Sequence, residues 1–130
     1  VTANSWSGAH VTDAFLDALE AIDDLPKARE ADARMNAGLF KAFSADLVAR
    51  QAETHARIRQ GELRAPLLIM WGYDDPSARF DPIGVDLLRL VLPSVPGAQV
   101  HLLNQAGHYV YRERPAQFND ALTSFVNASR

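Results

Sequence analysis

The chain has 130 residues, a 48% hydrophobic composition and a formal net charge of −3. This length and apolar content are enough for one domain with a hydrophobic core, and no apolar run approaches the roughly 20 residues that span a bilayer. Charges of both signs are scattered, so the composition favours a small molecule or a protein as partner and argues against nucleic acid and membrane. The absence of cysteine excludes disulfides and thiolate chemistry and favours a reducing, cytoplasmic location.

The first part of the chain, residues 1–61, has the periodicity of helices. Thr12 can cap a helix whose apolar residues share one face, namely Phe15, Ala18, Leu19 and Ile22. Pro26 can begin the next element. Gly38 then allows a break before a longer amphipathic stretch with the apolar residues Leu39, Phe40, Phe43, Leu47 and Val48. The pattern predicts a helical region whose apolar faces need a partner.

The second part, residues 62–130, alternates strand and helix patterns. Pro66 opens an apolar run that predicts a buried strand, and Pro82 stands at the expected start of a helix. A turn over residues 94–98 leads into a second apolar run, and Pro115 begins a last amphipathic helix. This alternation is typical of an α/β fold with a parallel sheet flanked by helices. Two strands alone make a poor sheet, so we expect the edge part of a larger one.

Each apolar run ends in a polar residue that chemistry can use. Asp75 follows the first run, and His108 follows the second after Gly107. Open α/β sheets place their sites at the carboxyl ends of the strands, so we expect these two side chains to meet. A histidine there can act as general base, and an aspartate can fix its tautomer and stabilise its cation. Asp74 and Asp81 are expected to be turn formers or helix caps.

The nucleophile that such a pair would serve is not found in the sequence. A Gly-x-Ser-x-Gly elbow needs glycines on both sides of the serine, and no serine here has that setting. Ser7 is followed by Gly8 but has no glycine two residues before it and no preceding apolar strand.

The second part of the chain holds three motifs: Trp71-Gly72-Tyr73-Asp74-Asp75-Pro76-Ser77-Ala78, Asn104-Gln105-Ala106-Gly107-His108-Tyr109 and Arg112-Glu113-Arg114-Pro115-Ala116-Gln117-Phe118. Together they resemble the C-terminal part of α/β-hydrolases, and in particular the meta-cleavage-product hydrolases. The resemblance covers Pro66 to about Val126, and the helical first part matches that family's lid by type and position. It implies that residues 62–130 are C-terminal strands and helices of an α/β-hydrolase core.

By this resemblance Asp75 is the triad acid and His108 is the base, while Tyr109, Ser77 and Ala78 face the substrate pocket. The family order of serine, aspartate and histidine implies a nucleophile N-terminal to this sequence. We therefore expect a fragment or small subunit of a serine-type hydrolase, with an N-terminal partner chain that carries the nucleophile elbow and with no cofactor.

The resemblance implies a small-molecule substrate that is hydrolysed at an ester, a lactone or a C–C bond beside a ketone. Leu19 stands where lids of the meta-cleavage group carry an arginine for the substrate carboxylate, which favours a less polar substrate. Two other functions remain open. An aspartate nucleophile in the partner chain would give an epoxide hydrolase or dehalogenase-like enzyme, and loss of chemistry would leave a ligand-binding receptor.

Other polar and aromatic residues have ordinary structural interpretations. His10, His55 and His101 lack the spacing of metal ligands, so we expect no metal. Trp71 either closes the core at the strand end or offers a stacking surface. Arg57 and Arg59 either lie on a solvated helix face or hold a substrate carboxylate.

Overall fold

The computed structural model describes residues 2–129, which form two compact units. The core unit contains the described residues up to His10 together with those from Arg57 onward, and the helical unit contains Val11–Ala56. The sequence predicts a helical region over residues 1–61 and core strands and helices over residues 62–130. In the structure the segment before Val11 groups with the core unit, and it contacts the loop that carries His108.

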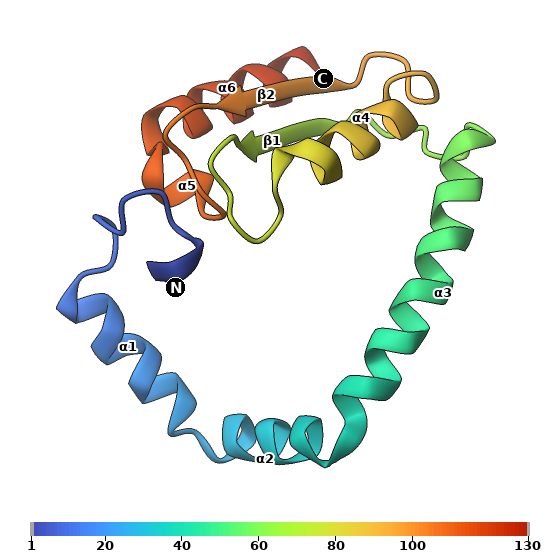
Figure 1. Ribbon diagram of the computed structural model, residues 1–130. Helices are drawn as coiled ribbons and strands as arrows, with labels where there is room; N and C mark the ends of the chain where they lie inside the picture. Colours follow the sequence, from blue (N-terminus) through green and yellow to red (C-terminus); the bar gives the residue numbers. More distant parts are fainter. Residues whose placement is uncertain (1, 130) are drawn as a thin grey trace. The chain divides into compact units, whose positions relative to one another are not determined.

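The helical unit holds α1 (Asp13–Asp23), α2 (Pro26–Arg34) and most of α3 (Phe40–Arg59) (Figure 1). The Thr12 hydroxyl accepts a hydrogen bond from the Phe15 amide at 3.2 Å, which confirms the predicted cap. Pro26 is the first residue of α2, as predicted. Gly38 adopts φ 111° inside a π-helical turn, η2 (Met35–Leu39), and so provides the predicted break between α2 and α3.

The three helices of this unit contain no buried residue. Most large apolar side chains of the unit are exposed, namely Leu16, Ile22, Leu25, Leu39, Phe40, Phe43, Leu47 and Val48. Short helices are marginal in water unless an apolar face packs against something. The unit therefore has no core of its own, in keeping with the prediction that its apolar faces need a partner.

The core unit is built on two parallel strands, β1 (Leu68–Gly72) and β2 (Gln99–Leu103), with Leu68 opposite Gln99 and Gly72 opposite Leu103. Between them the chain forms a π-helical turn, η3 (Phe80–Gly84), and α4 (Val85–Val91). After β2 come α5 (Val110–Glu113) and α6 (Pro115–Ala128). Figure 1 shows α4 and α6 on opposite sides of the strand pair. A parallel sheet with flanking helices is the predicted α/β architecture.

Two sequence predictions need correction. The strands are half-buried rather than buried: Gly72 is the buried residue of β1, and Leu102 of β2 is 42% exposed. Within residues 2–129 the two strands pair with each other alone, so neighbouring strands that would cover them are not present. The helix expected at Pro82 begins instead at Val85, because Asp81 has the extended angles φ −106° and ψ 120°.

The buried apolar residues all belong to the core unit, namely Leu90, Val91, Val95, Ala106, Val110 and Ala121. They lie on α4, in the turn that follows it, in the loop after β2, and on α5 and α6. Across residues 2–129, we find no helix with both the length and the apolar character that crossing a membrane requires.

Candidate active site

The loops after β1 and β2 are held against each other by backbone hydrogen bonds. The Tyr73 amide donates to the Leu103 carbonyl at 2.9 Å, and the Asp74 amide donates to the Ala106 carbonyl at 3.0 Å. A Cβ on Gly72 would run into the carbonyl oxygens of Gly107 and Ala106. The glycine at position 72 thus permits a close approach that brings Asp75 next to the histidine loop.

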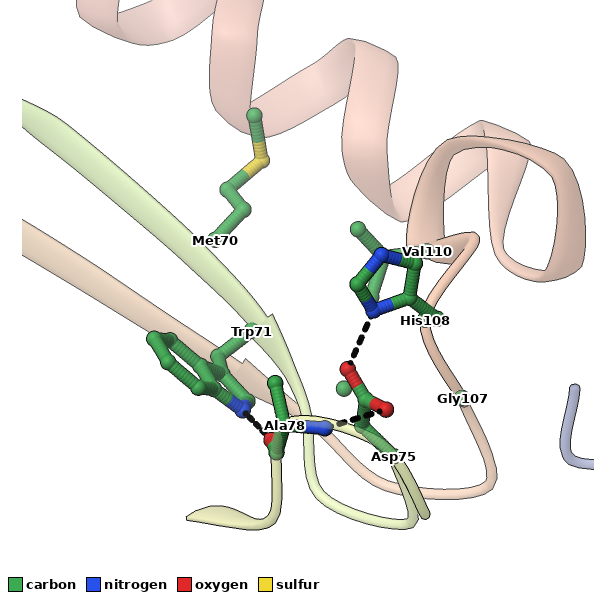
Figure 2. A pocket seen from close by; sticks show the side chains of 8 residues that line it. Met70, Trp71, Asp75, Ala78, Gly107, His108 and Val110 are labelled. Atoms are coloured by element: carbon green, nitrogen blue, oxygen red, sulfur yellow. Dashed lines mark hydrogen bonds and ion pairs between the residues drawn. The ribbon is translucent and has the colours of Figure 1, made fainter. Parts of the chain in front are cut away.

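Asp75 and His108 form a direct acid–imidazole pair. Asp75 Oδ2 lies 2.7 Å from His108 Nδ1. The Asp75 side chain is 6% exposed, whereas that of His108 is 47% exposed. Figure 2 shows the other ring nitrogen, Nε2, pointing away from Asp75. With the carboxylate ionised, Nδ1 carries the proton and donates it to Asp75, which leaves Nε2 as the proton acceptor.

The other carboxylate oxygen of Asp75 is fully engaged by the loop that follows. Asp75 Oδ1 accepts from the Ser77 amide at 2.8 Å, the Ser77 hydroxyl at 2.8 Å and the Ala78 amide at 2.9 Å. Burial by itself raises the pKa of the Asp75 carboxyl, but the hydrogen bonds from Ala78, His108 and Ser77 outweigh it and hold the pKa below its ordinary value. Asp75 is therefore a fixed, ionised partner for an imidazolium.

Asp75 and His108 both line a cavity of about 160 Å³. Its walls come from Met70, Trp71, Gly72, Asp75, Ala78, Gly107, His108 and Val110 (Figure 2). Binding pockets for small organic molecules are usually ~300 Å³ or more. The cavity thus has room for part of such a molecule beside His108.

The three residues expected to face the substrate take different positions. Ala78 lines the cavity, and its carbonyl accepts the Trp71 indole N–H at 2.9 Å. The Ser77 hydroxyl lies 3.2 Å from His108 Nδ1, on the side that Asp75 occupies, so Nε2 cannot activate it as a nucleophile. The Tyr109 ring packs edge-on against the His108 ring at 5.4 Å between centroids. Neither Ser77 nor Tyr109 is among the cavity-lining residues.

Trp71 combines features of its two interpretations. Its side chain lines the cavity at the end of β1, and the bond to Ala78 fixes the indole, so it forms a wall rather than a free stacking surface. Arg57 pairs with Glu62 at 2.7 Å between exposed side chains, as expected of a solvated helix position. Within residues 2–129 there is no group of three or more histidine, aspartate or glutamate side chains placed to hold a metal ion.

Sequence reasoning missed the residues that fix the loop carrying His108. Asp74 Oδ2 accepts the Gln105 amide at 2.9 Å, and Arg114 Nη2 donates to Gln105 Oε1 at 2.9 Å. Glu113 Oε2 accepts the Gly107 amide at 2.7 Å, and the His108 amide donates to the Asn4 carbonyl at 2.8 Å. Asp74 is thus more than a turn former. The motif around Glu113 was visible in the sequence, but its contact with the loop was not.

The chain is similar to known proteins, and it matches only part of the length of each. No family model matches the chain. A 2-hydroxy-6-oxononadienedioate/2-hydroxy-6-oxononatrienedioate hydrolase of Cupriavidus pinatubonensis is 35% identical over 111 residues, which are 85% of this chain and 37% of that protein. The hydrolase of the same name from Paraburkholderia xenovorans is 32% identical over 111 residues, again 85% of this chain and 37% of that protein. A solved structure of Est816, described as an N-acyl homoserine lactone degrading enzyme, has a TM-score of 0.43 and 30% identity over 55% of this chain and 25% of that chain.

These relatives are meta-cleavage-product C–C hydrolases of the α/β-hydrolase family, and the chain spans 37% of the length of each of the two. The predicted resemblance is confirmed. The chain is similar to the meta-cleavage-product hydrolases, and its parallel strands flanked by helices form an α/β architecture.

Proposed function

We propose that this chain supplies the acid and the base of a hydrolytic triad, with Asp75 as the acid and His108 as the base. The observation that carries the proposal is the 2.7 Å contact between a buried carboxylate and an exposed imidazole at the edge of a cavity. The similarity to hydrolases supports it independently. A merely structural ion pair would not need its histidine open at Nε2.

In the proposed reaction His108 Nε2 takes the proton of a hydroxyl nucleophile as that oxygen attacks a carbonyl carbon. Asp75 keeps the imidazole in the reactive tautomer and stabilises the imidazolium that forms. His108 then returns the proton to the leaving group and activates a water for the second half of the reaction. The net change is addition of one water molecule across the broken bond.

The nucleophile in this proposal lies on polypeptide outside these 130 residues. No serine of the sequence has the elbow pattern, and Ser77 faces Nδ1 rather than Nε2. We place the nucleophile on a separate N-terminal chain with a Gly-x-Ser-x-Gly elbow. Intact-mass analysis of the native protein tests this, because a second chain that co-purifies must then be detected.

For the substrate we propose a small molecule with a carbonyl group, cleaved at a C–C bond beside a ketone or at an ester or lactone. The names of the relatives support the C–C reaction. The leucine at position 19, where an arginine was expected, favours a substrate with less charge than a dienedioate.

The test is turnover by the complete protein, that is, this chain with the polypeptide that accompanies it in the cell. His108→Ala should lower kcat by at least about 10²- to 10⁴-fold on a model ester or ketone, the range of a general base. His55→Ala, on α3, is the matched control and should leave kcat unchanged. Equal activity of the His108 variant and the wild type would reject the proposal.

A further inference from the structure

Glu113, the last residue of α5, links two segments that are far apart in the sequence. Its Oε2 accepts the Gly107 amide at 2.7 Å. Its Oε1 accepts the Trp6 amide at 2.7 Å and the Ser7 amide at 3.2 Å. One half-buried carboxylate thus receives three backbone N–H groups, two from the segment before α1 and one from the loop that carries His108.

The two segments also contact each other directly. The His108 amide donates to the Asn4 carbonyl at 2.8 Å. A Cβ on Gly107 would lie 2.6 Å from the Asn4 carbonyl oxygen and 2.7 Å from the Trp6 nitrogen, so only glycine fits there. Consecutive backbone N–H groups at positions 107 and 108 are therefore fixed by different partners. This pair of bonds determines how the main chain enters His108.

We propose that Glu113 is a positioning residue, which aims the His108 imidazole at the reacting atoms by holding Gly107 and the segment Asn4–Ser7 together. This inference rests on the proposed function of His108. Glu113 does not line the cavity, so it acts through the loop rather than on the substrate. A displacement of a catalytic group by 1 Å can lower the rate about 100-fold. Loss of the contacts that Glu113 makes is therefore expected to lower the rate measurably.

The chemistry at this position requires a carboxylate. Both oxygens of Glu113 accept from donors on opposite sides. A glutamine has the same shape but one acceptor oxygen, and its NH₂ group would face an N–H group on one side. In either orientation of the amide, one of the two segments loses the oxygen that accepts its backbone N–H groups, and the NH₂ group faces them instead.

The experiment compares Glu113→Gln with Asp120→Asn in the complete protein. Asp120 is an exposed residue of α6, so its variant removes the same charge without touching the His108 loop. Glu113→Gln should lower kcat by about 10- to 100-fold with KM changed less than about twofold. Amide hydrogen exchange at Gly107 and His108 should become at least about tenfold faster. The Asp120 variant should change neither.

Exchange that becomes faster with kcat unchanged would overturn the positioning role, and so would no change in either quantity. If Glu113→Gln does not fold, Glu113→Asp decides. It keeps the charge but is one methylene too short to reach both segments, so smaller changes in the same direction are expected, and wild-type kcat would overturn the inference. Failure of the proposed function is recognised separately, by full activity of His108→Ala.

Discussion

Replacing Asp75 by asparagine should stop the reaction by exchanging one atom for another of nearly the same size. Asp75 Oδ1 accepts three hydrogen bonds from Ser77 and Ala78, so the asparagine oxygen must occupy that place. The NH₂ group then takes the place of Oδ2 and faces His108 Nδ1, 2.7 Å away. Because NH₂ is a donor, Nδ1 must become an acceptor, and the imidazole proton moves to Nε2.

A protonated Nε2 cannot take a proton from the nucleophile. The wrong tautomer in a triad of this kind lowers kcat by about 10⁴-fold, which equals about 5 kcal/mol of transition-state stabilisation. All three bonds to Oδ1 are retained, so the fold should survive and the loss should fall on kcat rather than on KM. We therefore expect Asp75→Asn to lower kcat by about 10³- to 10⁴-fold.

The assay is steady-state turnover by the complete protein, together with ¹⁵N NMR of the His108 ring to read its tautomer. The wild type should carry its proton on Nδ1 and the variant on Nε2. A variant with the proton on Nε2 and a kcat within about threefold of the wild type would refute the reasoning, because the tautomer would then not control the chemistry.

Three further outcomes are expected. Gly72→Ala should destabilise the complete protein by about 1–3 kcal/mol in thermal denaturation, because its Cβ meets the carbonyl oxygens of Gly107 and Ala106; an unchanged Tm would contradict that close approach. The depressed pKa of the Asp75 carboxyl should make the wild type more stable than Asp75→Asn above about pH 4, and the difference should vanish as pH falls through the native pKa; a difference that persists in acid would be inconsistent with this linkage. The Phe43 side chain is 54% exposed, so Phe43→Ala should change the free energy of unfolding by less than about 0.5 kcal/mol and yet alter substrate preference. A loss of stability above that value would indicate core packing instead.

Local signals in the sequence predicted where several elements begin. The cap at Thr12, the proline at the start of α2, the break at Gly38 and the proline at the start of α6 all depend on backbone groups within a few residues. The parallel pairing of the two apolar runs also followed, because a helix between two strands favours a parallel crossover.

Burial could not be predicted in the same way. The apolar run at β1 has the composition of a strand covered on both faces, yet its residues are half-buried because neighbouring strands are not among residues 2–129. Helix α4 begins at Val85 rather than at Pro82 because the backbone at Asp81 is extended, and no single residue type predicts these backbone angles.

The pairing of Asp75 with His108 could be expected from the strand ends and the family motifs, but the hydrogen bonds that hold the two residues in place could not. The Ser77 hydroxyl donates to Asp75, a contact that the sequence did not predict. Glu113 acts on Trp6 and Gly107, and the first of these lies 107 residues away in the chain. Contacts between segments this distant depend on the assembled fold and leave no local pattern in one sequence.

The most direct test of the acid and base assignment is covalent labelling of the complete protein with a fluorophosphonate, followed by peptide mapping. A triad served by His108 predicts an adduct on a serine outside these 130 residues, and little labelling in the His108→Ala variant. An adduct on a residue within this chain, no adduct at all, or equal labelling of the His108→Ala variant would contradict the account.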